Sequence, residues 1–211
     1  MKTEHARITA ASSLLDTGYA GSALGFEAKS GDAHLVCELE DRALIAVIDG
    51  LGHGPEAALA AGIAVQSVRE NAATAMNDIF KRCHETLRST RGAVMSLASV
   101  DGRNNTLTWA GIGNVEGTLI RGELGSNRAN ESLLLRGGVV GFRVPPLKIS
   151  TLSIFPGDTL LFATDGVRRD FGRGLDVSGS PFEIADYILR RFATKNDDAL
   201  VVVSRYLGRR A

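Results

Sequence analysis

The stretch that most constrains this chain is residues 43–58, ALIAVIDGLGHGPEAA, where an apolar run ends abruptly at a carboxylate. The six apolar residues before Asp49 are typical of a β-strand that is buried on both faces. Glycines follow the aspartate, and because glycine tolerates positive φ, backbone groups there can turn toward a ligand. An aspartate beside them is a hard oxygen donor. The alternative is an ordinary strand-to-helix turn in which Pro55 is the first helical residue.

Length and composition favour one globular domain over residues 1–211. The chain is 44% hydrophobic and 23% charged, which suits a sizeable core. Lysine plus arginine and aspartate plus glutamate both number 24, so no charge bias favours nucleic acid or an anionic membrane as partner. Cys37 and Cys83 form neither a metal cluster nor a disulfide framework, and we expect buried free thiols. Without an apolar signal region or a membrane span, we expect a soluble, cytoplasmic protein.

A hairpin count places a second aspartate opposite Asp49. Residues 33–39 read as a strand that precedes the apolar run. If Glu40 and Asp41 form a two-residue loop, counting outward puts Asp32 directly across from Asp49, about 4.5–5.5 Å away at Cβ. Two carboxylates so close are unfavourable unless one is protonated or a cation lies between them. Glu-Asp is not the preferred hairpin turn, and a longer loop would shift the register.

The remaining elements follow the order strands, two helices, strands, one helix, strand. Helices are expected from residue 55, after residue 75, and after Ser180, which forms a capping box with Glu183. Further strands are expected at residues 93–100, 106–112, 117–120, 132–135, 159–164 and 199–203, with two more within residues 7–28. This α+β pattern predicts a β-sandwich of two mainly antiparallel sheets flanked by helices, in α-β-β-α layers.

Periodicity also predicts which helix faces lie in the core. The expected core residues are Ala58, Ala61, Val65, Val68 and Ala72 in the first helix, Met76, Ile79, Phe80, Cys83 and Leu87 in the second, and Phe182, Ala185, Ile188, Leu189 and Phe192 in the third.

Carboxylates occur at one end of several buried strands. Asp32 and Asp197 or Asp198 precede a strand, whereas Asp49 and Asp165 end one. Because the start of one antiparallel strand neighbours the end of the next, these acids can gather along one edge. The alternative for each is a turn aspartate that binds local amides.

If the acids gather, they form a site of oxygen ligands only. Such ligands suit Mg²⁺, Mn²⁺ or Ca²⁺, and not Zn²⁺. Several carboxylates at one point indicate more than one ion, and two ions about 3.5–4 Å apart assist in-line attack on a phosphoryl group. Metal-assisted hydrolysis of a phosphate ester is therefore the predicted reaction class.

Four motifs together resemble the PP2C-type (PPM) metal-dependent serine/threonine protein phosphatases of the bacterial SpoIIE branch. The motifs are SGD at residues 30–32, DGLGHG at 49–54, FATDG at 162–166 and NDDALVVV at 196–203, in the family's order over nearly the whole chain. The resemblance implies a β-sandwich with flanking helices and two Mn²⁺ or Mg²⁺ ions. It also implies these metal ligands: Asp49, which bridges the ions, the Gly50 carbonyl, Asp32, Asp165 and Asp197.

The resemblance gives other nearby residues supporting or open roles. It aligns Asp197 with the ligand, so that Asp198 supports the ligands from behind. His53 stands at a glycine-turn position of the family and is a candidate catalytic residue, with a structural role as the alternative. The arginine that binds substrate phosphate in many eukaryotic relatives has no clear counterpart, and Lys29 is the candidate for that task.

Two further segments resemble the RsbX-type feedback phosphatases of the stressosome. Residues 110–117, AGIGNVEG, stand where many members of the branch carry Ala-Gly-His-Asn-Pro, and RGGVVGF follows at 136–142. An N-terminal sensor domain is also expected to be absent. This resemblance implies action on phosphorylated STAS-domain proteins of the RsbS and RsbR kind, without nucleic-acid or membrane partners. The alternatives are an anti-anti-sigma substrate of the RsbV or SpoIIAA type, or a non-catalytic metal-binding interaction module of the same fold.

Overall fold

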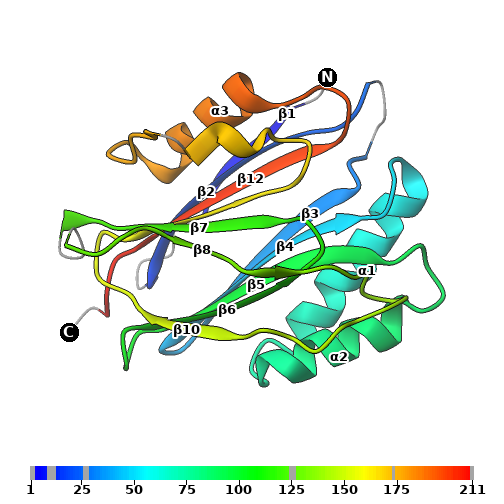
Figure 1. The fold of residues 1–211 in the computed structure, drawn as a ribbon, viewed down its shortest axis with the longest axis horizontal. Helices are drawn as coiled ribbons and strands as arrows, with labels where there is room; N and C mark the ends of the chain where they lie inside the picture. Colours follow the sequence, from blue (N-terminus) through cyan, green and yellow to red (C-terminus); the bar gives the residue numbers. More distant parts are fainter. Residues whose placement is uncertain (1–2, 9–12, 26–28, 124–126, 173, 210–211) are drawn as a thin grey trace.

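The computed structural model describes residues 3–8, 13–25, 29–123, 127–172 and 174–209. Within them, two six-stranded sheets pack face to face and helices cover both outer faces (Figure 1). The predicted α-β-β-α sandwich is confirmed. Among these residues, no helix is both long enough and apolar enough to span a bilayer.

The two sheets draw their strands from both halves of the chain. In spatial order, the first contains β1 (Thr3–Ile8), β2 (Leu15–Ser22), β12 (Ala199–Tyr206), β11 (Thr159–Ala163), β7 (Glu116–Ile120) and β8 (Glu131–Ser132). The second contains β10 (Ser150–Ser153), β6 (Thr106–Ile112), β5 (Ala93–Asp101), β4 (Arg42–Gly50) and β3 (Asp32–Leu39), with β9 (Leu135–Arg136) parallel to β6. All the other strand pairs between these elements are antiparallel.

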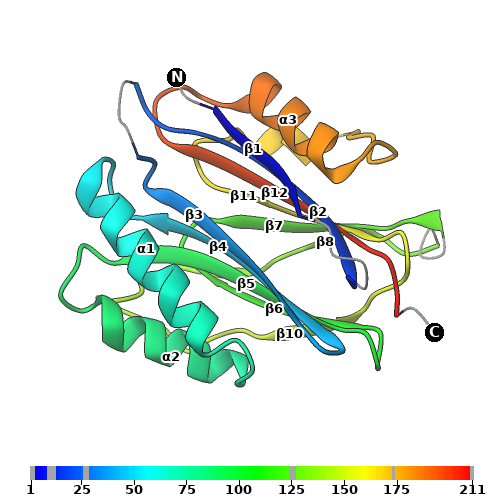
Figure 2. The ribbon, with the colours of Figure 1, turned by 180° about the vertical axis from the view of Figure 1, so that it is seen from behind.

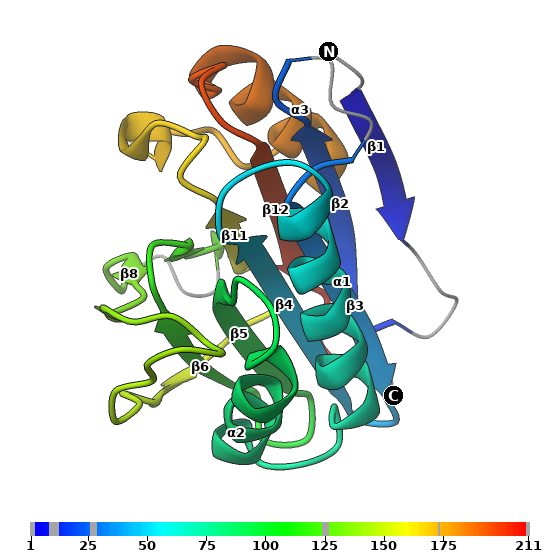
Figure 3. The ribbon, with the colours of Figure 1, turned by 90° about the vertical axis from the view of Figure 1, so that its right-hand side faces the viewer.

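Three helices cover the sandwich. Helices α1 (Pro55–Glu70) and α2 (Met76–Leu87) lie against the second sheet, and α3 (Pro181–Phe192) lies against β2 and β12 of the first sheet (Figures 2 and 3). A short 3₁₀ helix, η2 (Arg169–Gly172), lies between β11 and α3 in the chain. The capping box of α3 is confirmed, because Ser180 Oγ accepts from Glu183 N at 3.3 Å and Ser180 N donates to Glu183 Oε2 at 2.9 Å.

Residues 43–48 of strand β4 are all apolar because both faces of the strand are buried here. Leu44, Ala46 and Ile48 pack under α1 and α2. Ala43, Ile45 and Val47 point into the core between the sheets, which also contains Trp109, Phe162 and Tyr206. The alternation of side chains along a strand thus turns one continuous apolar run into contacts with two separate cores.

The register of the β3–β4 hairpin is the one that the sequence predicts. Leu39 pairs with Arg42 across the two-residue loop, and Asp32 pairs with Asp49. Glu40 has a φ of +34°, so the tight turn is made although a bulky residue stands where glycine or asparagine is preferred.

The predicted core faces of two helices need correction. The buried residues of α1 are Ala57, Ala60, Ala61, Ala64, Ser67 and Val68, while the expected Ala58 and Val65 are only partly buried. Alanines occur on several faces of this helix, so periodicity alone does not show which face is buried. In α3, Phe182 and Phe192 are partly buried and Ile184 takes a core position instead. The predicted face of α2 is confirmed.

Two strand assignments also differ from the expectation. Residues 132–135 do not form one strand: β8 pairs with β7 in the first sheet and β9 with β6 in the second, so the chain crosses between sheets there. Buried Leu133 fills the core at this crossing, which explains the strand-like apolar pattern. Strand β10 was not expected because its sequence, STLS, is mostly polar.

The predictions of two N-terminal strands and of two buried free cysteines are partly confirmed. Of the two strands expected within residues 7–28, β2 lies inside this range and β1 begins earlier, while positions 9–12 and 26–28 lie outside the described residues. Both cysteines are free thiols, Cys83 buried and Cys37 partly exposed.

Candidate metal centre

Two antiparallel strand pairs, one in each sheet, present acids at the same end of the sandwich. In the second sheet, Asp32 at the start of β3 lies opposite Asp49 near the end of β4. In the first sheet, Ala163 at the end of β11 pairs with Val201 near the start of β12. Asp165 follows the one strand and Asp197 precedes the other, so these two acids extend from adjacent strand ends.

A hydroxyl connects the acids of the two sheets. Thr164 Oγ1 donates to Asp32 Oδ2 at 2.7 Å and also accepts from the backbone N–H of Leu200 at 2.9 Å. Thr164 is buried, so this contact ties the carboxylate of one sheet to the backbone of the other.

Asp198 also joins the two sheets, but through the backbone. Its Oδ1 accepts from Leu24 N at 2.7 Å and its Oδ2 from Gly31 N at 2.6 Å. The residue is only 3% exposed. Since both oxygens are engaged and Gly31 is next to Asp32, Asp198 holds the start of β3 in place. Asp197, its neighbour, is exposed.

Burial and crowding of like charges raise the pKa of Asp49 to about 7. Burial is the larger cause, and the charges of Asp165, Asp197 and Asp198 add to it. The pKa of Asp32 is raised well above its ordinary value, first by burial and then by the charge of Asp49. These acids therefore gather negative charge at one end of the sandwich.

Asp165 is exposed, and non-acidic side chains also act on it. Burial and the charge of Asp197 raise its pKa. The guanidinium of Arg169 and a hydrogen bond from Asn114 act in the opposite direction. Asn114 Nδ2 donates to Asp165 Oδ2 at 2.6 Å.

The donor set fits a hard divalent cation. The groups are carboxylates and a glycine carbonyl, the ligands that Mg²⁺ and Mn²⁺ prefer, and their negative charge is what a cation would neutralise. Among the described residues, however, no group of three or more His, Cys, Asp or Glu side chains is already arranged to hold a metal ion.

Two motif glycines are required by close backbone approach. A Cβ on Gly50 would lie 2.2 Å from the Ala57 carbonyl oxygen, so the first turn of α1 packs directly on the end of β4. A Cβ on Gly166 would lie 1.9 Å from the Asp198 carbonyl oxygen. The turn residue Gly52, in contrast, has a φ of +83°, which favours glycine for conformational reasons.

His53 and Lys29 lie near the acids, and their roles stay predictions. His53 is exposed in the loop between β4 and α1. Lys29 is also exposed and lines a groove on the outer surface of α1 with Pro55, Ala58 and Leu59.

Three residues near the acids were missed by sequence reasoning: Thr164, Asn114 and Arg169. Thr164 immediately precedes Asp165, and a hydroxyl beside a motif acid was the available signal. Asn114 lies in the segment that sets this chain apart from many members of the branch. Arg169 lies in an Arg-Arg-Asp run, which reads simply as a solvated loop.

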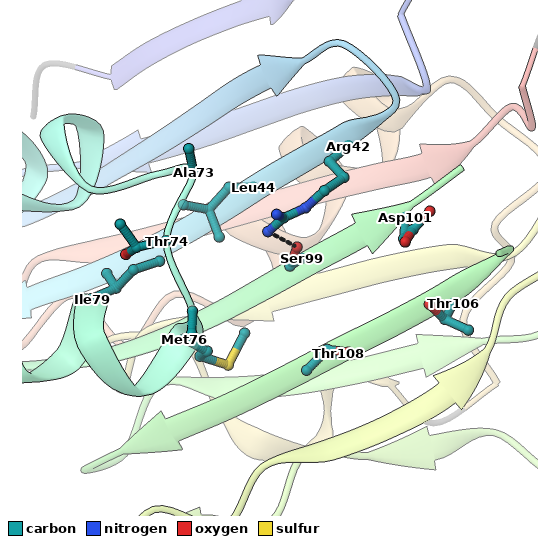
Figure 4. A pocket seen from close by; sticks show the side chains of 11 residues that line it. Arg42, Leu44, Ala73, Thr74, Met76, Ile79, Ser99, Asp101, Thr106 and Thr108 are labelled. Carbon is teal, nitrogen blue, oxygen red and sulfur yellow. Dashed lines mark hydrogen bonds between the residues drawn. The ribbon is translucent and has the colours of Figure 1, made fainter. Parts of the chain in front are cut away.

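A pocket at the other end of the second sheet is separate from the acids. This cavity of about 400 Å³ contains Arg42, the first residue of β4, whereas Asp49 lies near the last (Figure 4). Arg42 donates to Ser99 Oγ at 3.3 Å, and Thr106 and Thr108 line the same wall.

Comparison with known proteins identifies relatives over nearly the whole chain. The family model of stage II sporulation protein E (SpoIIE) matches residues 40–207. Phosphoserine phosphatase RsbX of Bacillus subtilis (strain 168) is 25% identical over 180 residues, which cover 84% of this chain and 83% of that protein.

Solved structures share the fold. One, described as "The bacterial stressosome: a modular system that has been adapted to control secondary messenger signaling", is 34% identical with a TM-score of 0.83, covering 90% of this chain and 99% of the other. RsbX in complex with magnesium is 20% identical with a TM-score of 0.83, covering 96% and 99% of the two chains.

Proposed function

The chain belongs to the SpoIIE family of PP2C-type serine/threonine phosphatases, and we propose that it dephosphorylates STAS-domain proteins of a stressosome as negative feedback in stress signalling. The similarity to RsbX and to the stressosome-related structure supports this substrate class. The observation that carries the catalytic part is the pairing of Asp32 with Asp49 beside Asp165 and Asp197. A cytoplasmic location and a single domain over residues 1–211 are parts of the same proposal.

The proposed site holds two Mn²⁺ or Mg²⁺ ions on Asp32, Asp49, the Gly50 carbonyl, Asp165 and Asp197. When bound, such ions supply Lewis acidity for a phosphoryl oxygen and lower the pKa of water. The chain's own residues set the ligand geometry. Thr164 fixes one oxygen of Asp32, and Asp198 fixes the backbone next to it. Asn114 fixes one oxygen of Asp165 and leaves the other for a ligand.

The central test of the proposal is phosphate release from phosphorylated STAS proteins. We expect Mn²⁺-dependent release from an RsbS- or RsbR-type phosphoprotein, suppressed by chelation, because the acids need a cation to act. Rates on an RsbV-type phosphoprotein measured in parallel separate the two substrate classes.

The matched variants in this assay are Asp165→Asn and Asp78→Asn. Asp165 belongs to the proposed site, whereas Asp78 is exposed on α2. The first variant should lose turnover and the second should keep it. Tight binding of the phosphoprotein by the unmodified protein without any turnover would instead favour a non-catalytic interaction module.

A further inference from the structure

Two consecutive arginines follow the Asp165-Gly166 motif and make different contacts. Arg168 Nε lies 3.1 Å from Asp170 Oδ1, and its guanidinium stacks over the ring of Phe192 at 5.2 Å. Arg169 Nε instead lies 3.0 Å from Glu116 Oε1. The first arginine thus packs toward the end of α3, and the second toward the start of β7.

The position of Glu116 brings Arg169 to the acid site. Glu116 is the first residue of β7 and pairs with Ala163, which is two residues before Asp165. An arginine held by Glu116 therefore lies at the strand ends that carry Asp165. In agreement with this placement, the positive charge of Arg169 lowers the pKa of Asp165 against the effects of burial and Asp197.

We propose that Arg169 binds the phosphoryl group of the substrate and that Glu116 is its positioning residue, an inference that rests on the proposed function. The ion pair with Glu116 uses Nε, so the Nη groups supply the donors for two phosphate oxygens. The Arg169 side chain is 77% exposed and thus accessible to a protein-bound phosphoresidue.

A guanidinium at this place suits a phosphate monoester. The ester is an anion, and a guanidinium binds two of its oxygens in a fixed geometry. Beside Asp165, Arg169 would fix the orientation of the phosphoryl group on the side of the incoming substrate.

Two other cations near the site are weaker candidates. Lys29 lines the α1 groove. Arg91 forms an ion pair with Glu56 in the first turn of α1, and its Nη1 lies 3.0 Å from the position that a Cβ on Gly52 would take. Arg91 therefore lies over the glycine turn, and it serves as the competing variant in the test.

The test compares Arg169→Ala with the adjacent Arg168→Ala in Mn²⁺-dependent hydrolysis of p-nitrophenyl phosphate and a phosphoserine peptide. We expect Arg169→Ala to raise KM roughly tenfold or more with a smaller change in kcat, as loss of a charge-assisted contact to bound phosphate predicts. Arg169→Lys should raise KM by an intermediate amount, because the lysine ammonium cannot form the paired hydrogen bonds of a planar guanidinium. Glu116→Gln should raise KM less, and Arg168→Ala should match the unmodified protein.

A second measurement does not depend on turnover. Inorganic phosphate should raise the Tm of the Mn²⁺-loaded protein, and Arg169→Ala should lose most of this shift while Arg168→Ala keeps it. If the unmodified protein has no phosphatase turnover, the proposed function is wrong. The phosphate-induced rise in Tm then tests by itself whether Arg169 binds phosphate. Equal KM values and equal phosphate-induced Tm shifts for Arg169→Ala and Arg168→Ala would overturn the proposal. A rise in KM confined to Arg91→Ala would also overturn it.

Discussion

Replacing Asp49 with asparagine is expected to lower Mn²⁺-dependent phosphatase turnover by more than roughly a hundredfold. Asp49 lies opposite Asp32 and is electrostatically coupled to Asp165 and Asp197, so it is central to the proposed ligand set. An amide cannot bridge two cations as a carboxylate does. Initial rates at saturating Mn²⁺, with the far-UV circular dichroism of both proteins as the folding control, measure the loss.

The same substitution should stabilise the metal-free protein at neutral and higher pH. The pKa of Asp49 is raised from 3.8 to about 7, so between these values the folded state retains a proton that the unfolded state has lost. Stability of the unsubstituted protein therefore falls as pH rises through this window. Asp49→Asn removes this contribution, so its Tm advantage in EDTA should be larger at pH 8 than at pH 4.

The metal role of Asp49 and its destabilising effect in the metal-free protein can be refuted separately. Full activity of Asp49→Asn would refute the metal role of Asp49. A Tm of the metal-free variant below that of the unsubstituted protein at pH 8 would show that Asp49 forms stabilising contacts that outweigh charge repulsion.

Replacing Asp198 with alanine is expected to destabilise the fold by about 3 kcal/mol or more. The carboxylate is almost fully buried and accepts hydrogen bonds from the backbone N–H groups of Leu24 and Gly31. Each such bond to a charged acceptor is worth about 1.5–3 kcal/mol, and both donors lose their partner. Urea unfolding monitored at the tryptophan, Trp109, measures the change.

Asp197→Ala is the matched control for Asp198→Ala. Asp197 is exposed, and its Oδ1 accepts a local hydrogen bond from Asp198 N at 2.9 Å. We expect this variant to lose Mn²⁺ affinity while unfolding within about 1 kcal/mol of the unsubstituted protein. If the two variants exchanged these effects, the assignment of Asp197 as ligand and Asp198 as support would be reversed.

The hairpin shows how much of the site could be predicted from local rules. A two-residue loop and strict alternation are enough to place Asp32 opposite Asp49, because strand register propagates from the turn. The burial of both faces of β4 and the core face of α2 likewise follow from an apolar run and helical periodicity, whereas the predicted faces of α1 and α3 need correction. In α1, alanines occur on several faces, so the sequence does not show which face is buried. The close packing of Ala57 on Gly50 determines the buried face.

Side-chain contacts between segments far apart in the chain could not be derived in this way. The bond from Thr164 to Asp32 and the pairing of Arg169 with Glu116 join residues far apart in the chain, and no sequence period relates them. The predicted roles of Asp197 as ligand and Asp198 as support come from family resemblance and not from spacing. The hydrogen bonds from two backbone N–H groups to the buried Asp198 carboxylate support this prediction.

Anomalous diffraction from crystals of the protein grown with Mn²⁺ would show directly whether these acids hold two metal ions. We expect two Mn²⁺ peaks bridged by the carboxylate of Asp49. Their other protein ligands should be Asp32, the Gly50 carbonyl, Asp165 and Asp197, with Asp198 still bonded to Leu24 and Gly31. A fully Mn²⁺-loaded, active protein whose peaks lie away from Asp49 would contradict the account.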